Sequence, residues 1–190
     1  MNVRGIILSM RVFVISDTNH RLTELPNPED VDLMITCGDI LPHEIPIEEL
    51  NKPFFGVYGN HDNGSYLEEL GAVNLHIKVV ELNGLKFGGF ESCINYKPQE
   101  RSLVKLYTQE EVDKLLKNFP PVDVFVAHSP PFGLLDIPGD HVHTGFYAFK
   151  DYIDRYHSKI FLCGHAGENA EMEYKGTKIY KTEGFRILTI

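Results

Sequence analysis

The stretch Phe54-Phe55-Gly56-Val57-Tyr58-Gly59-Asn60-His61-Asp62 joins an apolar run to a cluster of polar side chains. A short, continuously apolar run is typical of a strand buried on both faces of a sheet. The polar cluster then lies where the strand ends and a loop begins. Because the ends of neighbouring strands meet at one edge of a sheet, the fold is decided by whether other strands of the chain end in the same way.

Four further polar clusters each follow an apolar run. They are Asp17-Thr18-Asn19, Gly38-Asp39, Ala127-His128-Ser129-Pro130-Pro131 and Gly164-His165-Ala166-Gly167. The five runs predict strands at Arg11–Ser16, Leu33–Cys37, Phe54–Tyr58, Val122–Ala127 and Ile160–Cys163. We expect the clusters to meet at one edge, where they supply carboxylates, a carboxamide and imidazoles. That set of donors is typical of a site for divalent metals.

Two helices are expected between these strands. Thr108-Gln109-Glu110-Glu111 is a capping box that opens a helix over Val112–Asn118, with Leu115 and Leu116 on its inner face. The segment Gly145–Tyr156 carries apolar and aromatic residues at helical spacing and charged residues between them. An aromatic stripe of this kind is more often part of a core than a binding surface.

Two dipeptides predict hairpin turns. Asn83-Gly84 separates two short apolar runs, and Lys175-Gly176 does the same near the end of the chain. Strands with helices outside them and added hairpins predict a layered α/β fold (α+β in some schemes) in a single domain over residues 1–190. Residues 1–9 are either a short added strand or an upstream start assignment, so they form a candidate N-terminal extension.

The composition excludes several classes of protein. A content of 43% hydrophobic and 24% charged residues is typical of a globular domain. The formal net charge of −9 argues against binding of nucleic acid duplexes, although metal ions could still attract a small phosphorylated substrate. No apolar stretch approaches the ~20 residues that cross a bilayer, so no membrane partner is expected. The three cysteines lack Cys-x-x-Cys spacing and are expected to be buried in a reducing cytoplasm.

The clusters suit the hydrolysis of a phosphate ester. Two divalent ions about 3.5–4 Å apart lower the pKa of water and neutralise charge on the phosphoryl oxygens. Such a pair needs a bridging carboxylate, and Asp39 suits this role because the preceding glycine allows a tight turn. Asp17 is expected to serve one flanking ion. The other ion is expected to be held by Asn60, His128 and His165.

The His61-Asp62 pair is the candidate for proton transfer. His61 follows a ligand-type asparagine, so its ring is expected to point past the metals, where Asp62 can orient it. This arrangement suits a general acid that protonates the leaving-group oxygen, a contribution of ~10²–10⁴ in rate. Asp62 has a second interpretation, as a cap of the helix expected at Ser65–Leu70.

In order and spacing, these clusters resemble the calcineurin-like metallophosphoesterases. The family pattern is D-x-H, G-D, G-N-H-[DE], a lone histidine and G-H-x-H, and the chain follows it from Met10 onward. The proline pair after His128 is similar to small prokaryotic members and their brain-type relatives. The resemblance implies an αββα sandwich of two mixed sheets, hydrolase activity, and a cofactor of one or two divalent ions such as manganese, iron, zinc, nickel or cobalt. It gives His61 the role of leaving-group acid.

The chain departs from the family pattern at two positions. Asn19 and Gly167 stand where the family carries histidines, and both positions belong to the first metal. We therefore expect this metal site to fill weakly. Substitutes for the missing ligands, or contacts to substrate, could come from His20, His143 and Glu168, although a lone loop histidine is more often simply solvated.

Two functions remain open from the sequence. The first is a metal-dependent phosphoesterase with a phosphodiester or nucleotide-like substrate, and the intact His61-Asp62 pair favours it. The second is a degenerate family member that binds metal and a nucleotide or phosphate with little or no turnover, and Asn19 with Gly167 favours it. Of the two, we expect the metal-dependent phosphoesterase, with activity that is reduced or strongly dependent on metal.

Overall fold

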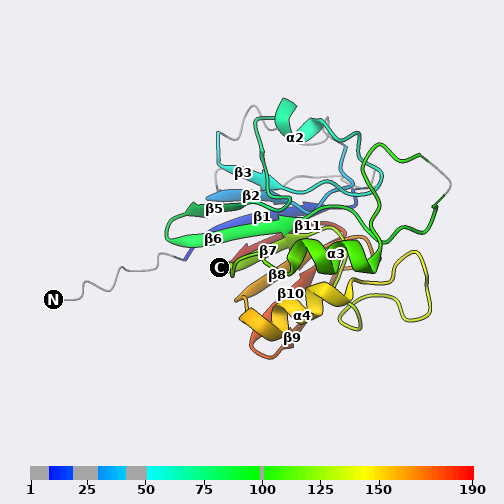
Figure 1. Ribbon diagram of the computed structural model, residues 1–190. Helices are drawn as coiled ribbons and strands as arrows, with labels where there is room; N and C mark the ends of the chain where they lie inside the picture. The colour runs from blue at the N-terminus through cyan, green and yellow to red at the C-terminus, as the bar shows by residue number, and fades with distance from the viewer. Residues whose placement is uncertain (1–8, 19–29, 42–50, 99–100) are drawn as a thin grey trace.

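The computed structural model describes residues 9–18, 30–41, 51–98 and 101–190, which form two packed β-sheets with helices on their outer faces (Figure 1). The first sheet has the order β11-β1-β2-β3-β4. Its strands are β1 (Arg11–Ser16), β2 (Leu33–Thr36), β3 (Phe54–Gly56), β4 (Val73–Asn74) and β11 (Gly184–Thr189). The second sheet has the order β5-β6-β7-β8-β10-β9. Its strands are β5 (Val79–Leu82), β6 (Leu85–Phe90), β7 (Val124–Ala127), β8 (Ile160–Cys163), β9 (Ala170–Tyr174) and β10 (Thr177–Lys181).

In the described part of the chain, three helices cover the sheets. The short helix α2 (Tyr66–Glu69) packs on the outer face of the first sheet, where Tyr66 and Leu67 join its outer core. The helices α3 (Gln109–Leu116) and α4 (Tyr147–Tyr156) cover the outer face of the second sheet. Both sheets mix parallel and antiparallel pairs, so the expected αββα sandwich is confirmed.

Strand β1 shows why an uninterrupted apolar run marks a buried strand. Val12 and Val14 point into the core between the two sheets, whereas Phe13 and Ile15 point into the core under the outer layer. All four side chains are buried because side chains alternate between the faces of a strand and both faces are covered.

The parallel strands bring the polar clusters to one edge. In the first sheet β1, β2 and β3 are neighbours and run parallel, and in the second sheet β7 and β8 do the same. The carboxyl ends of these five strands carry the five clusters, as the sequence predicted. In open α/β sheets this edge is where ligands bind.

Helix α3 begins with the expected capping box. The Thr108 hydroxyl accepts from the Glu111 N–H (3.2 Å), and the Glu111 carboxylate accepts from the Thr108 N–H (2.9 Å). The helix ends at Leu116 rather than at residue 118. Leu116 is buried, but Leu115 is 41% exposed. The expectation that Leu115 faces inward was therefore wrong, because neighbouring helical residues are rotated by about 100° around the axis.

Both expected hairpins are present. Asn83 and Gly84 have φ angles of 53° and 77°, and Lys175 and Gly176 have 49° and 83°. Two consecutive left-handed residues are typical of the type I′ turn that matches the twist of paired strands. The sequence analysis missed β11, which pairs antiparallel with β1 and extends the first sheet by one strand.

Cys37, Cys93 and Cys163 are buried, as expected, and none is in a disulfide. In the part of the chain that the structure describes, no helix has the length and apolarity to cross a membrane. Residues 1–8 of the candidate extension lie outside the described residues. Directly after it, Met10 and Ile190 exchange two backbone hydrogen bonds of 2.9 Å.

Candidate metal centre

Three of the candidate ligands have unusual backbone conformations at the ends of their strands. Asp17, Asp39 and His165 have φ angles of 50°, 53° and 67°, in the left-handed region. This conformation costs a residue with a side chain about 1–2 kcal/mol. Strain of this kind persists only where the surrounding structure enforces it, and it concentrates at functional sites. The chain is therefore bent at these three positions so that their side chains turn toward the same edge.

Asp17, Asp39 and His128 form the centre of this edge. Their ligand atoms all lie within 4.8 Å of one another. The His128 side chain is fully buried, and its Nε2 atom lies 3.5 Å from Asp39 Oδ2 and 2.9 Å from Asn60 Oδ1. The structure thus brings together residues from three strand ends of the first sheet and one of the second.

The orientation of His128 fits a metal ion. Its Nδ1 atom lies 2.8 Å from the Cys37 carbonyl, to which it donates. In the neutral imidazole, the lone pair of Nε2 then faces the oxygens of Asn60 and Asp39, and such a convergence of electron pairs is what a divalent cation binds. The mixed oxygen and imidazole set suits Mn²⁺, Fe²⁺, Co²⁺, Ni²⁺ or Zn²⁺. The imidazole is held by a second partner, as is usual for metal-binding histidines.

The charges of the centre agree with a cation site. Burial alone would lower the pKa of His128, but the charges of Asp39 and Asp17 outweigh it and raise that pKa above its usual value. Burial also raises the pKa of Asp17 above the usual range for aspartate. The edge therefore concentrates negative charge in a poorly solvated place, where a cation is strongly favoured.

Two glycines allow the loops to approach so closely. A Cβ on Gly164 would lie 2.0 Å from Ser16 Oγ and 2.2 Å from Asp17 Oδ2. A Cβ on Gly59 would lie 2.1 Å from Asp39 Oδ1. Any side chain at either position would displace a candidate ligand.

Asp62 holds two loops together. Its carboxylate accepts from the backbone N–H groups of Gly59 (2.6 Å), Asp39 (2.9 Å) and Ile40 (3.3 Å). Burial, and then the charge of Asp39, raise the pKa of Asp62 to about 6. Asp62 therefore fixes the turn that carries Asp39 against the turn that carries Asn60.

The alternative interpretation of Asp62 as a helix cap was wrong. The side chain of Asn63, one residue later, accepts from the N–H groups of Ser65 (3.0 Å) and Tyr66 (3.1 Å) at the start of α2. The sequence could not separate the two neighbours, because aspartate and asparagine are both strong capping residues.

His61 is exposed at the rim of the centre. Its backbone N–H donates to Asp39 Oδ1 (2.8 Å), which ties the position of the residue to the proposed bridging carboxylate. Its ring is close enough to His165 to influence the pKa of that residue. The action of Asp62 on the His61 ring stays a prediction, since the described hydrogen bonds of the Asp62 carboxylate go to backbone amides.

His165 lies between two other imidazoles. Its ring centroid is 4.8 Å from that of His128 and 5.0 Å from that of His143. Its Nε2 atom lies 3.0 Å from the carbonyl of Val142. Burial, followed by His128 and His143, lowers the pKa of His165 well below its usual value, so the ring is neutral and can bind a metal.

The positions that depart from the family pattern are only partly visible. Asn19 and His20 lie outside the described residues. Gly167 is exposed with a φ of 77°, and a Cβ there would have no neighbour within 4 Å. Glu168 is also exposed. Of the suggested substitutes that the structure describes, His143 is the one in ring contact with a candidate ligand.

Sequence reasoning missed two partners of the site. Asp140 lies 2.7 Å from His143 Nδ1, and Tyr96 accepts from the Asn60 amide at 3.4 Å. Asp140 could have been found, because an aspartate three residues before a histidine can reach its ring in a turn. Tyr96 gave no such signal, because its contact depends on the path of a loop 36 residues away along the chain.

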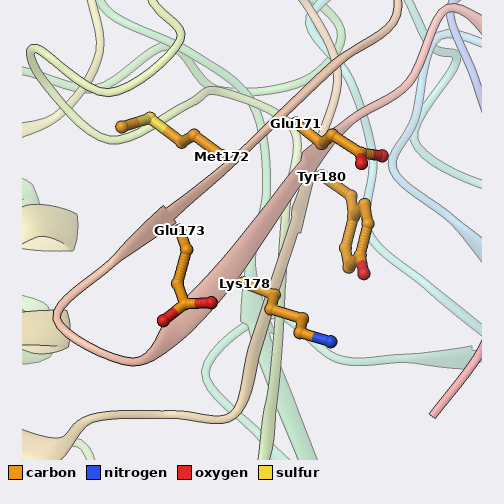
Figure 2. Close-up of a pocket in the computed structure, with 5 residues that line it drawn as sticks. All are labelled: Glu171, Met172, Glu173, Lys178 and Tyr180. Carbon is orange, nitrogen blue, oxygen red and sulfur yellow. The ribbon is translucent and has the colours of Figure 1, made fainter.

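Two surface hollows lie away from this centre. One, of about 260 Å³, lies along the β9–β10 hairpin (Figure 2). Its lining residues are Glu171, Met172, Glu173, Lys178 and Tyr180. The other, of about 340 Å³, lies between α3 and α4. Neither of these two hollows is lined by a candidate ligand.

Comparisons with solved structures agree with this fold. The protein TT1561 of Thermus thermophilus is 12% identical, with a TM-score of 0.64 over 96% of this chain and 98% of that one. The phosphopantetheinyl hydrolase PptH from Mycobacterium tuberculosis is 16% identical, with a TM-score of 0.63 over 94% and 91% of the two chains. A putative 5′-nucleotidase from Staphylococcus aureus is 12% identical, with a TM-score of 0.58 over 96% of this chain and 53% of that one.

A search of curated protein sequences gave no significant match. The sequence model of the calcineurin-like phosphoesterases matches residues 10–168, a range that contains all five strand-end clusters. The chain therefore belongs to the calcineurin-like phosphoesterase family.

Proposed function

We propose that this protein hydrolyses a small phosphodiester or nucleotide-like substrate in a metal-dependent reaction. The observation that carries the proposal is the convergence of Asp17, Asp39 and His128 within 4.8 Å at the carboxyl edge of the sheets. The family of the chain is one of metal-dependent phosphoesterases, which supports the proposal. We also propose that residues 1–190 form one domain, because the C-terminal β11 pairs with β1.

The residues would form two metal sites of unequal affinity, each held by its own group of ligands. Asp39, Asn60, His128 and His165 form the stronger group, since each is buried or nearly so. The weaker group has Asp17 and shares Asp39, while Gly167 contributes no side chain. When bound, divalent ions supply Lewis acidity and lower the pKa of a water molecule.

His61 would deliver a proton to the leaving group. The residue is exposed at the rim, where it can touch a bound ester, and its backbone is fixed by the bond to Asp39 Oδ1. Protonation of the leaving oxygen removes the cost of expelling an alkoxide, which is the role of a general acid. Asp62 would support this step by holding the turn before His61 in place.

The charge of the protein and its fold both support this substrate class. With a net charge of −9, the protein has little attraction for a long polyanion, but a metal can draw one phosphate group to the edge. A phosphopantetheinyl hydrolase and a putative 5′-nucleotidase share the fold, and their names point to small phosphorylated substrates. A substrate of this kind is therefore proposed for this protein as well.

A specific observation favours a second candidate function. Gly167 is exposed and lacks the side chain with which the family would complete the first metal site. A protein with one filled site could bind a nucleotide or phosphate and turn it over slowly or not at all.

The two functions are separated by hydrolysis of a chromogenic phosphodiester and a chromogenic monoester with Mn²⁺, Ni²⁺, Co²⁺, Zn²⁺ or Mg²⁺. The enzyme predicts metal-dependent turnover that falls by about 10²–10⁴ in His61→Ala. His141→Ala is the matched control, because His141 is an exposed histidine of the described residues that we assign no role. Metal and phosphate binding without turnover above background would establish the binding function instead.

A further inference from the structure

The imidazole of His165 is held by a carbonyl from another loop. Its Nε2 atom lies 3.0 Å from the carbonyl oxygen of Val142, which is 23 residues away along the chain. Because a carbonyl can only accept, the neutral ring carries its proton on Nε2 and its lone pair on Nδ1. His165 is 8% exposed, so water competes little with this bond. The position of Val142 therefore decides which nitrogen His165 offers to a metal.

Nδ1 lies on the side of the His165 ring that is joined to the centre. It is bonded to the carbon that carries the side chain, so it is the ring nitrogen nearer to the backbone. The backbone N–H of His165 donates to Oδ2 of Asp17 (2.8 Å), one of the central carboxylates. The bond from Nε2 to Val142 thus keeps the lone pair on the side of the ring nearer to this backbone.

Asp140 aims the Val142 carbonyl. Its Oδ1 atom accepts from the N–H groups of Val142 (2.8 Å) and His143 (3.3 Å). The C=O of Val142 and the N–H of His143 belong to one planar peptide unit and point in opposite directions. A carboxylate that holds this N–H therefore turns the carbonyl away from itself, and in this structure the carbonyl meets His165.

Two further bonds close the turn formed by residues 140–144. Asp140 Oδ2 lies 2.7 Å from His143 Nδ1, and the Thr144 hydroxyl donates to the Asp140 carbonyl. The His143 ring in turn lies beside the His165 ring, with centroids 5.0 Å apart. Asp140 thus uses both carboxylate oxygens within the turn that contacts His165.

A buried lysine joins the same loop to the residue after His165. The Lys181 ammonium donates to the carbonyls of Leu135 (3.1 Å) and Ala166 (2.8 Å), and the residue is 8% exposed. Leu135 lies in the loop between β7 and α4 that also carries residues 140–144. A buried ammonium is costly unless it is hydrogen-bonded, so these two bonds are needed. The loop is therefore tied to the end of β8 at a second place.

We propose that Asp140 is a positioning residue of the metal centre, which acts on His165 through the Val142 carbonyl. It selects the His165 tautomer that leaves Nδ1 for a divalent ion, while Asp140 itself touches neither the ion nor the substrate. This inference rests on the place of His165 in the proposed function, but not on hydrolysis.

The first test observes the Nε2 proton of His165 in the metal-free full chain, by ¹H–¹⁵N spectroscopy of the histidine side chains. In the wild type this proton is expected to exchange slowly with water, because it is buried and hydrogen-bonded. In Asp140→Ala we expect its signal to be lost. The Nδ1 proton of His128 is an internal control and should persist, because its acceptor is the Cys37 carbonyl in a different loop.

Three variants separate positioning from a general loss of structure. Asp140→Asn keeps an oxygen for the two backbone N–H groups and is expected to retain the His165 signal. His143→Ala removes a ring but leaves the bond between Asp140 and the Val142 N–H, so it should also retain the signal. His141→Ala, at an exposed position of the same turn, is the matched control. Urea unfolding of each metal-free variant shows whether the fold is intact.

The second test is the affinity for Zn²⁺, measured by competition with a chromophoric chelator. Asp140→Ala is expected to weaken the tightest site by about 10–100-fold, and Asp140→Asn by a smaller factor. His141→Ala is expected to bind Zn²⁺ as the wild type does.

The outcomes distinguish this inference from the proposed function. Unchanged Zn²⁺ affinity in Asp140→Ala, or a His165 signal that persists there, would overturn the inference and leave the proposed function standing. Loss of the signal in His143→Ala would assign the effect to the ring instead of the carbonyl, and would also overturn the inference. Loss of signal and affinity in Asp140→Ala, when the wild type hydrolyses neither ester, would support the inference and overturn the proposed function.

Discussion

The backbone N–H of His165 donates to Oδ2 of Asp17 at 2.8 Å, across 148 residues of sequence. Asp17 follows β1 of the first sheet, and His165 follows β8 of the second, so this bond joins the edges of the two sheets. The Ser16 hydroxyl donates to the same oxygen. The carboxylate is thereby aimed by both sheets, and the metal centre depends on how they pack.

The close approach of Gly164 to this carboxylate gives the first prediction. Gly164→Ala is expected to weaken metal binding by more than 10-fold, because its Cβ would lie 2.2 Å from Asp17 Oδ2 and force it away. Chelator competition measures the loss, and urea unfolding is expected to show about 1–3 kcal/mol of destabilisation. Gly71→Ala is the control: its φ is 69° and its Cβ would meet nothing within 4 Å, so it should lose stability but not metal affinity.

Asp62 is expected to matter for stability as well as for activity. In Asp62→Asn one of the three backbone N–H groups that the carboxylate accepts from would face an NH₂ group. We expect a loss of about 1–3 kcal/mol in the free energy of unfolding, measured in urea at pH 7. Asp113→Asn, an exposed change on α3, is expected to stay within about 0.5 kcal/mol of the wild type. Equal effects of the two changes would contradict the role of Asp62 as the link between the loops.

His76, which lies outside the metal centre, is expected to make the stability of the protein depend on pH. Burial, then the charges of Lys105 and Lys78, lower its pKa to about 4. Glu91 lies 3.8 Å from the His76 Nε2, but at this distance its attraction does not outweigh burial. The pKa of His76 in the unfolded chain is about 6.5. As pH falls below this value, the unfolded chain binds a proton at His76, whereas the folded chain binds it only near pH 4. Stability is therefore expected to fall through this window, by up to about 3 kcal/mol.

The measurement is the urea midpoint between pH 7 and pH 4.5. His76→Gln does not titrate, so its stability should fall less steeply with acid than that of the wild type. His141→Gln, at an exposed position, should keep the wild-type slope. Parallel slopes in all three proteins would show that His76 is not the group responsible.

Gly167 gives a prediction about the weaker half of the centre. A histidine there would have room, but its φ of 77° is a left-handed conformation that costs about 1–2 kcal/mol. Gly167→Ala carries the same strain without an imidazole and is the matched control. We expect Gly167→His to bind a second equivalent of Zn²⁺ about 10-fold more tightly than Gly167→Ala does. Equal second-site affinities would mean that position 167 does not reach the metal.

Local sequence patterns were sufficient to predict the strands and the helix start discussed above. The strand at Arg11–Ser16 and the capping box at Thr108 were found because burial of both faces and helix capping leave short-range marks in a sequence. Strand β11 was missed because half of its residues face solvent, so it lacks the continuous apolar run of the buried strands. Its place in the sheet comes from pairing with β1, at the other end of the chain.

By itself, the sequence determined which residues stand at strand ends and which family pattern they follow, because both depend on residue type and spacing. Only the tertiary structure decided that Asp62 binds backbone amides, that Val142 orients His165, and that His143 joins the imidazoles. These contacts link loops from different strands, and their distances are set by the packing of two sheets. No local spacing records that packing, so a sequence can name the ligands of a centre without showing how they are held.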